Sequence, residues 1–294
     1  ITSAAGTADA METVAKVELT PDEVQRAVSQ SNGCIAWNGR LNHSAIDDVM
    51  NSITRPLGVD STKWAVASIL SKKLAAGATH TIIDIPVGPY TKVQQAKEGR
   101  ELSRLFEAVG AGIGMTVIAR VTDGSGPIGR GIGPALEVRD VYKVLQNASD
   151  APQDLREKAL GFAASILEWD PNITRGQGRK LASSILRTGQ ALSSLERIID
   201  AQGRKANPDI PGNLVHDVKA PHSGKVSSID SYRISGIARR AGAPMDKSSG
   251  IDLSIKLGQE VKAGEHLYLI HSSVESELHI ASVSAEKDSG IKID

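Results

Sequence analysis

The sequence contains a single cysteine, Cys34, and few aromatic residues, with two Phe, three Trp and four Tyr among 294 residues. A lone cysteine cannot form a disulfide within the chain or a cysteine zinc site, and so few rings argue against a base-stacking surface for nucleic acids. Lys and Arg number 34, and Asp and Glu also number 34, so the broad basic field of a nucleic-acid-binding protein is missing. No apolar run approaches the roughly 20 residues of a membrane helix. These absences predict a globular protein with neither a nucleic acid nor a membrane as partner.

The beginning of the chain lacks a charged-then-apolar signal segment, which together with the lone cysteine predicts a cytoplasmic location. The first residue is Ile1 rather than Met, and residues 1–7 have the character of a loop, where a domain would ordinarily begin with a helix or strand. We therefore expect the chain to be part of a longer polypeptide.

Capping signals and hydrophobic periodicity predict alternating helices and strands over residues 1–205. Thr20 can cap a helix, Pro21 suits its first position and Glu23 can complete a capping box, so we expect a helix over about 21–29. The runs at 80–87, 92–110 and 115–121 predict a strand, a helix and a strand, which implies a parallel βαβ unit. The other elements predicted here are a strand at 34–37 and helices at about 61–76, 135–146, 154–169 and 178–201.

Turn-forming residues at 207–212, NPDIPG, separate this region from a stretch of shorter elements. The elements predicted beyond them are strands at 215–218, 224–226, 251–255 and 265–270 and a helix at about 231–241. We therefore predict an α/β fold over residues 1–205, with a mixed or parallel sheet flanked by helices, and a small C-terminal α+β domain over residues 212–294.

Several familiar site motifs are excluded by context or are missing. The glycines between Gly124 and Gly129 have the spacing of a dinucleotide fingerprint, but Pro127 and Pro134 delay the helix that should meet the pyrophosphate. There is no GxxxxGK[ST] loop, no HExxH pair and no GxSxG elbow. The phrase VKAGE at 261–265 is similar to biotinyl and lipoyl carrier turns, but the lysine hairpin that carries the prosthetic group is absent. We therefore expect no metal and no organic cofactor.

One polar cluster is a candidate site. Ser68 and Lys72 lie four apart and hence on one face of the predicted helix. Lys92 follows the carboxyl end of a strand, where open α/β sheets place their ligands, and Asp60 precedes the helix. A hydroxyl and two ammonium groups suit an anionic or carbonyl-rich substrate. The alternative is structural, with Asp60 as a helix cap, Ser68 as a small packing residue and both lysines in solvent.

At these residues the sequence resembles the thymidine phosphorylase and archaeal AMP phosphorylase family of nucleoside phosphorylases. The resemblance covers most of the chain, and its strings occur in the family's order. The matching strings are ITSAAGTADAME at 1–12, PLGVD at 56–60, ASILSKKLAAG at 67–77, IDIPVGP at 83–89, GPALEV at 133–138, AQG at 201–203, SGKVSSID at 223–230, and residues 258–271.

The resemblance implies a reaction and a set of site residues. Family members cleave a nucleoside or nucleotide with inorganic phosphate as co-substrate, releasing the base and a sugar 1-phosphate. Their subunits pair through a helical lobe, to which residues of about 45–76 would contribute, so the full-length protein would form a homo-oligomer, such as a dimer. The implied base-binding residues are Ser68 and Lys72, the implied nucleotide-contacting residues are Thr2, Ser3, Thr7, Ser68 and Lys92, and the implied proton donor to the departing base is Asp60.

The sequence departs from the family pattern in three places. Ile53 occupies the position of an arginine in the pyrimidine enzymes, with Arg55 two residues later. The family's glycine-rich phosphate loop is missing, and residues 42–48 differ from the family's Leu-Ala-Pro-Ala-Asp phrase, although Asp47 is retained. We therefore do not expect phosphorolysis from this chain alone.

Three hypotheses on function follow from the resemblance. The first is a thymidine phosphorylase of pyrimidine metabolism and nucleoside salvage. The second is an AMP phosphorylase releasing adenine and ribose 1,5-bisphosphate, favoured by residues 1–7 and Asp60. The third is a non-catalytic chain that binds a nucleotide or a partner subunit.

Overall fold

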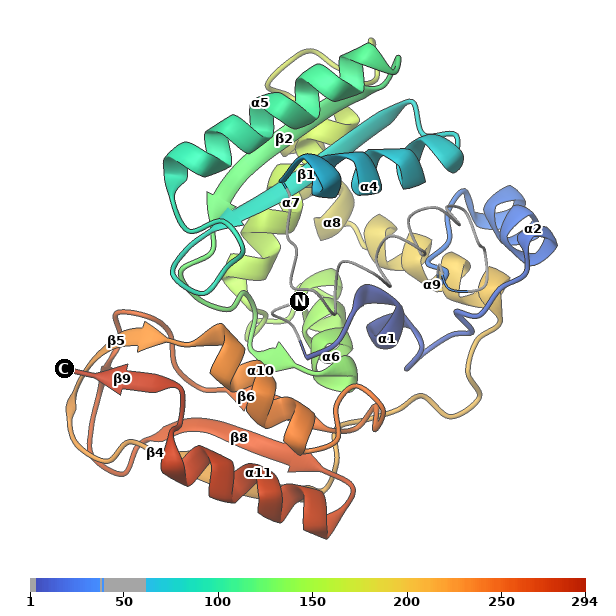
Figure 1. Cartoon of the computed structure of the whole chain (residues 1–294). Helices are drawn as coiled ribbons and strands as arrows, with labels where there is room; N and C mark the ends of the chain where they lie inside the picture. Colours follow the sequence, from blue (N-terminus) through green and yellow to red (C-terminus); the bar gives the residue numbers. More distant parts are fainter. Residues whose placement is uncertain (1–3, 38, 40–61) are drawn as a thin grey trace. The chain divides into compact units, whose positions relative to one another are not determined.

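The computed structural model describes residues 4–37, 39 and 62–294 (Figure 1). The chain divides into two compact units, one formed by residues 1–37 and 126–294 and the other by residues 38–125. Both units combine helices with β-sheets, and the second half of the larger unit contains a small α+β domain. The predicted α/β fold class is therefore confirmed. The predicted domain boundary at 205–212 stays a prediction, and the part of the predicted helical lobe at 45–61 lies outside the described residues.

The smaller unit is a βαβ arrangement preceded by a helix. Its elements are α4 (Thr62–Ala75), β1 (His80–Val87), α5 (Ala96–Gly112) and β2 (Thr116–Asp123). Strands β1 and β2 are parallel, in register from His80 opposite Thr116 to Val87 opposite Asp123. The parallel βαβ unit predicted from the sequence is confirmed.

Helix α5 packs tightly on this sheet because glycines face the strands. A Cβ atom on Gly110 would lie 2.3 Å from Val117 Cγ2, and one on Gly99 would lie 2.8 Å from Val87 Cγ2. The core of this unit consists of Val66, Leu70, Ile83, Ile85, Phe106, Met115, Val117 and Ala119. Apolar side chains from both strands and both helices therefore hold the unit together, at about 25 cal/mol per Å² of apolar area buried.

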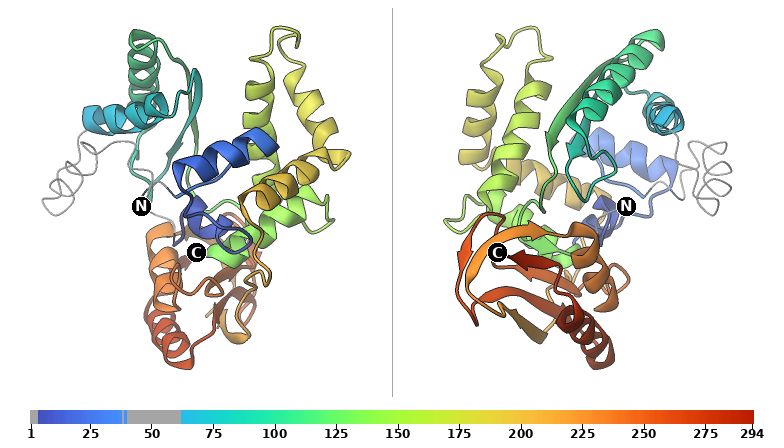
Figure 2. Two further views of the ribbon diagram at one scale, coloured as in Figure 1. Left: turned by 90° about the vertical axis from the view of Figure 1, so that its right-hand side faces the viewer. Right: turned by 60° about the vertical axis from the view of Figure 1, so that its left-hand side comes forward.

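The helical part of the larger unit precedes and follows the smaller unit in sequence. Its elements are α1 (Thr7–Met11), α2 (Pro21–Ser31), α6 (Pro134–Leu145), α7 (Gln153–Leu167), α8 (Gly178–Arg187) and α9 (Gln190–Gln202). Helix α2 starts with the predicted capping box, in which Glu23 N donates to Thr20 Oγ1 at 3.3 Å and Thr20 N donates to Glu23 Oε2 at 2.8 Å. Figure 2 shows α7 and α8 lying side by side, where Leu160, Ala182 and Leu186 are buried.

The C-terminal α+β domain contains two antiparallel sheets and two helices. Its elements are β4 (Leu214–Lys219), β5 (Gly224–Ile229), α10 (Ser231–Arg240), β6 (Gly250–Leu253), β7 (Glu260–Val261), β8 (His266–Ser272), α11 (Glu275–Lys287) and β9 (Ile291–Ile293). One sheet has the order β3-β6-β8-β4 and the other β7-β5-β9, where β3 is Gly131–Ile132. A strand from before α6 thus completes the sheet of the C-terminal domain.

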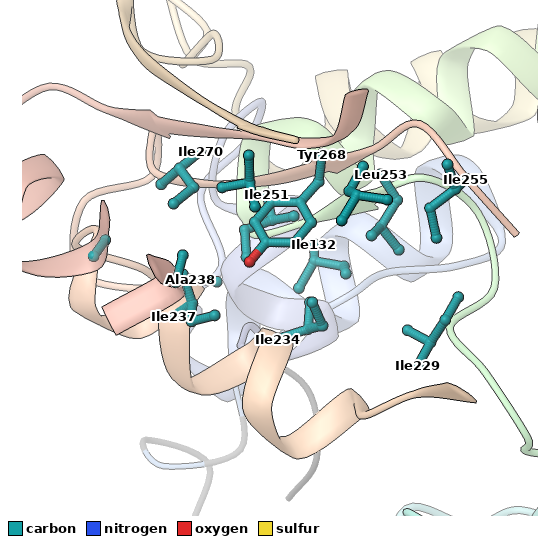
Figure 3. Packing of buried hydrophobic residues seen from close by; sticks show 14 of the residues in the cluster. Ile132, Ile229, Ile234, Ile237, Ala238, Ile251, Leu253, Ile255, Tyr268 and Ile270 are labelled. Carbon is teal, nitrogen blue, oxygen red and sulfur yellow. The ribbon is translucent and has the colours of Figure 1, made fainter. Parts of the chain in front are cut away.

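The core of this domain surrounds one tyrosine ring (Figure 3). Tyr268 is fully buried among aliphatic side chains, including Ile234 and Ile237 of α10 and Ile251 of β6. Its hydroxyl donates to Ser289 O at 2.9 Å, so the only polar atom of the side chain has a partner. Burial raises the pKa of this phenol, which therefore stays protonated and serves packing.

Two element predictions are wrong. Residues 34–37 form no strand, because their backbone groups bond elsewhere: Ile35 N donates to Gln202 Oε1 at 2.6 Å and Trp37 N to Val17 O at 2.8 Å. The predicted helix over 178–201 is two helices, since the chain breaks at Gly189, whose φ of +76° is left-handed. Among the described residues, no helix combines the length and apolar character that crossing a membrane requires.

Candidate functional site

Three of the predicted site residues lie in the smaller unit. Ser68 and Lys72 are both partly buried on α4, one helical turn apart, so their side chains share a face as predicted. Lys92 is exposed and lies four residues before α5, in the segment that follows the carboxyl end of β1. The smaller unit therefore carries both the hydroxyl and the two ammonium groups of the predicted cluster.

The loop that holds Lys92 has a defined conformation. Gly88 N donates to Thr91 Oγ1 at 3.0 Å, and Thr91 Oγ1 donates in turn to Val93 O at 2.6 Å. Gly88 also packs directly on the loop after β2, because a Cβ atom there would lie 2.3 Å from Gly124 O. The carboxyl ends of both parallel strands thus meet in a tight backbone contact that only glycine permits, and this contact limits where the loop can place Lys92.

The other predicted residues belong to the N-terminal segment or to a part that is not described. Thr7 is the first residue of α1 and is exposed. It belongs to the larger unit, whereas Ser68, Lys72 and Lys92 belong to the smaller one. Thr2, Ser3 and Asp60 lie outside the described residues, as do Ile53 and Arg55.

Helix α1 is tied to the C-terminal domain by charged side chains. Gly6 N donates to Asp9 Oδ2 at 2.8 Å, which closes the start of the helix. Lys247 Nζ lies 3.1 Å from Asp9 Oδ1 and 2.8 Å from Glu12 Oε2. A single lysine of the C-terminal domain therefore holds two carboxylates of the segment that contains Thr7.

A second polar group, at the start of α6, lies beside this arrangement. Glu137 Oε1 accepts a hydrogen bond from Gly133 N at 3.1 Å. Burial is the main factor that raises the pKa of Glu137 to about 7, and the carboxylates of Asp9 and Asp140 raise it further, against the lowering effect of the Gly133 hydrogen bond. Glu137 therefore changes its protonation state near neutral pH, which the sequence analysis did not anticipate.

Asp140 organises the turn that leads into α6. Its carboxylate accepts from Arg130 N at 2.7 Å, from Gly131 N at 2.8 Å and from Arg139 at 2.8 Å. Arg139 also pairs with both carboxylate oxygens of Asp252 on β6. Arg139 and Asp252 lie 113 positions apart, so no local pattern in the sequence pointed to this pair. In the described residues, no cluster of three or more His, Cys, Asp or Glu side chains is arranged to hold a metal ion.

Comparisons with known proteins place these residues in a family. Residues 225–292 match the family described as the pyrimidine nucleoside phosphorylase C-terminal domain. The chain is 59% identical over 285 residues to a bifunctional ribose 1,5-bisphosphokinase-thymidine phosphorylase of Azorhizobium caulinodans, covering 97% of this chain and 41% of that protein. A protein of the same name from Cupriavidus pinatubonensis is 55% identical, with 100% of this chain and 50% of that protein covered.

A relative from Methylococcus capsulatus, provisionally named as a thymidine phosphorylase, is 48% identical, with 100% of this chain and 57% of that protein covered. The chain thus spans about half the length of the curated relatives that it matches. The chain corresponds to the C-terminal part of proteins of the thymidine phosphorylase family.

Proposed function

We propose that the protein containing this chain is a nucleoside phosphorylase, a pentosyltransferase that cleaves thymidine or a related nucleoside with inorganic phosphate. The observation that carries this proposal is the identity of 48–59% to relatives named for thymidine phosphorylase, over nearly the whole chain. The shared face of Ser68 and Lys72 on α4 supports it, because these are the residues that the resemblance assigns to the base. No organic cofactor or metal takes part in the proposed reaction.

In the proposed reaction a phosphate oxygen attacks the anomeric carbon of the sugar as the bond from that carbon to the base nitrogen breaks. The electron pair of the broken bond goes to the base, which leaves with a proton, and the products are the free base and a sugar 1-phosphate. Ser68 and Lys72 bind and orient the base, and hydrogen bonds from them stabilise the charge that develops on it. Asp60 supplies the proton, while Lys92, Thr2, Ser3 and Thr7 contact the rest of the substrate.

AMP is the second candidate substrate, with adenine and ribose 1,5-bisphosphate as products. It is favoured by residues 1–7 and Asp60, which resemble the AMP phosphorylase branch of the family, and a purine leaves more easily when its ring nitrogen is protonated. A chain that only binds a nucleotide or a partner subunit is the non-catalytic alternative. We further propose that the full-length protein acts as a homo-oligomer in the cytoplasm.

The test of this function is phosphate-dependent base release from thymidine, uridine and AMP by the full-length protein. We expect release from thymidine or uridine, with formation of the sugar 1-phosphate. Release from AMP alone would overturn the thymidine hypothesis in favour of AMP phosphorolysis. Binding of a base or nucleotide by calorimetry, with no turnover of any of the three, would support the non-catalytic alternative.

Ser68 and Lys72 can be tested with a matched control on the same helix. In the full-length protein, Lys72→Ala and Ser68→Ala should each weaken substrate binding roughly tenfold, the scale expected for losing a hydrogen bond to a charged or polar ligand. Lys73→Ala is the control, because Lys73 is exposed at the next position of α4. The melting temperature should change little in all three variants. Equal affinities in Lys72→Ala, Ser68→Ala and the control would return both residues to a structural role.

One substitution separates the proposed role of Asp60 as a proton donor from the alternative role as a helix cap. Asn caps a helix about as well as Asp, so Asp60→Asn should leave the melting temperature nearly unchanged. Asn cannot deliver a proton, so activity should fall by roughly a hundredfold or more, the scale of general-acid catalysis. The loss should be greatest for a purine substrate. A variant that melts much earlier yet keeps its specific activity would identify Asp60 as a cap.

A further inference from the structure

The segment that contains Thr7 is anchored on the C-terminal domain at two places. Ala4, only 2% exposed, belongs to the buried cluster that includes Tyr268. Five residues later, Asp9 pairs with Lys247, a residue 238 positions away in the sequence. One anchor is apolar and the other is ionic, and together they bracket residues 5–8.

Lys247 is itself held in a fixed position. Its carbonyl oxygen accepts a hydrogen bond from Ala135 N at 3.0 Å, at the start of α6. Two residues later, Ser249 packs against Gly133, where a Cβ atom would lie 2.4 Å from Ser249 O. Gly133 has a φ of +129°, a conformation that favours glycine. The backbone around Lys247 therefore cannot move without disturbing α6.

The Lys247 side chain spans α1 from its first turn to its end. Its ammonium group lies between Asp9, in the first turn, and Glu12, the C-cap residue, and the side chain is 17% exposed. Partial burial lowers the pKa of Lys247, but hydrogen bonds to Glu12 and Asp9 outweigh this effect and raise it. Lys247 is thus charged throughout the physiological pH range, and its single positive charge attracts both carboxylates.

Helix α1 depends on such contacts because it is short. It has only five residues, and helices shorter than about 12 residues are marginal in water without tertiary support. Its own capping bond, from Gly6 N to Asp9 Oδ2, uses the same carboxylate that Lys247 orients. Release of Asp9 from Lys247 would therefore also loosen the start of the helix, where Thr7 lies.

We propose that Lys247 is a positioning residue that holds α1, and with it Thr7, in the orientation that binds substrate. The substrate part of this inference rests on the proposed function, in which Thr7 contacts the nucleotide. The C-terminal domain would then take part in substrate binding through the N-terminal segment, without contacting the substrate itself.

The experiment compares hydrogen exchange and steady-state kinetics of the full-length protein with those of three variants. Lys247→Met removes the charge but keeps a long apolar side chain, and Lys247→Arg keeps the charge. The control is Lys219→Met, because Lys219 is a more exposed lysine of the same domain, paired to Asp217 at 3.4 Å. In Lys247→Met we expect backbone exchange at residues 6–12 to accelerate roughly tenfold, while exchange in α7 and α8 stays as in the wild type.

The kinetic readout separates positioning from general destabilisation. In Lys247→Met, KM should rise roughly tenfold, the scale of losing a charge-assisted hydrogen bond, while kcat changes less. Lys247→Arg should restore most of the affinity, and Lys219→Met should behave as the wild type. Asp9→Asn provides a second route to the same result, since Asn still accepts from Gly6 N but carries no charge for Lys247, and it decides the question if Lys247→Met does not fold.

Two results would overturn the proposal. Unchanged exchange at residues 6–12 in Lys247→Met and in Asp9→Asn would show that Lys247 does not hold α1. Accelerated exchange with an unchanged KM, in a protein that is active, would show that holding α1 does not serve substrate binding. Absence of turnover in the wild-type protein would instead overturn the proposed function, and exchange at residues 6–12 would then decide on its own whether Lys247 holds α1.

Discussion

Replacing Glu137 by Gln should make the protein more stable at alkaline pH and leave its stability almost unchanged at acid pH. Glu137 is partly buried at the start of α6, and its carboxyl accepts from Gly133 N at 3.1 Å. Burial, followed by the nearby carboxylates of Asp9 and Asp140, raises its pKa to about 7. A Gln side chain keeps the acceptor for Gly133 N but cannot ionise, so the substitution removes only the charge.

The direction and the size of this change in the free energy of unfolding follow from the pKa values of Glu137 in the unfolded and in the folded chain. In the unfolded chain Glu137 ionises near its ordinary pKa of 4.5, and in the folded chain near 7. Between these pH values the folded state binds more protons than the unfolded state, so the free energy of unfolding falls as pH rises, by up to about 1.4 kcal/mol per pH unit. Over the whole interval the loss is at most about 3 kcal/mol. The stabilisation that the protonated Glu137 gives the folded state is fully present below pH 4.5 and is lost above pH 7.

The assay is urea unfolding of the wild type and of Glu137→Gln at several pH values from 4 to 8. We expect similar free energies of unfolding near pH 4 and a more stable variant at pH 8, by about 2 kcal/mol or more. Glu286→Gln is the control, because Glu286 is exposed on α11, and its stability should follow the wild type at every pH. The raised pKa of Glu137 would be refuted if the free energies of unfolding of the wild type and Glu137→Gln changed with pH in the same way, or if the variant were less stable at pH 8.

Two further substitutions test the hydrogen bonds of Asp140 in the larger unit and the packing of Gly88 in the smaller unit. Asp140→Ala should lower the free energy of unfolding by about 3 kcal/mol, measured in urea, because it removes the acceptor of the buried Gly131 N and the part-buried Arg130 N, and one of the two carboxylates that pair with Arg139. The exposed Asp150→Ala should have little effect, and equal losses in the two variants would contradict the assigned role of Asp140. Gly88→Ala should destabilise the smaller unit by about 1–3 kcal/mol, since its Cβ would lie 2.3 Å from Gly124 O. The measurement is thermal melting, and Gly112→Ala is the control: no atom lies within 4 Å of its Cβ, so the melting temperature should not change. An unchanged melting temperature in Gly88→Ala would show that the loops after β1 and β2 can separate.

Local sequence patterns predicted an element correctly where residues close together in the sequence make the contacts that stabilise it. The capping box of α2 joins Thr20 to Glu23, three residues apart, and both hydrogen bonds form as predicted. The parallel pair β1 and β2 followed from two β-branched runs flanking an amphipathic helix, because strands joined by a crossover helix lie parallel in one sheet. Likewise, the shared face of Ser68 and Lys72 depends only on helical geometry, which the sequence already implied.

Local sequence patterns gave a wrong prediction where a backbone group bonds to a residue distant in the sequence. The apolar run at 34–37 has the composition of a strand, but its amides are satisfied by the side chain of Gln202 and by Val17 O. Helix α11 has no stripe of large apolar residues, because its buried positions are the small residues Ala281, Ser282, Ser284 and Ala285. Its periodicity is therefore weak, and it was not predicted.

The amino-acid sequence by itself determined the fold class, most helices and strands, and the resemblance that names the candidate residues. Only the tertiary structure decided that β3 joins the sheet of the C-terminal domain, that burial beside Asp9 and Asp140 raises the pKa of Glu137, and that Lys247 meets α1. Each of these depends on groups from distant positions: backbone pairing for β3 and β6, desolvation and neighbouring charges for Glu137, and an ion pair for Lys247. No residue type or local spacing encodes such contacts, because they exist only when the folded chain brings the two groups together and removes water from between them.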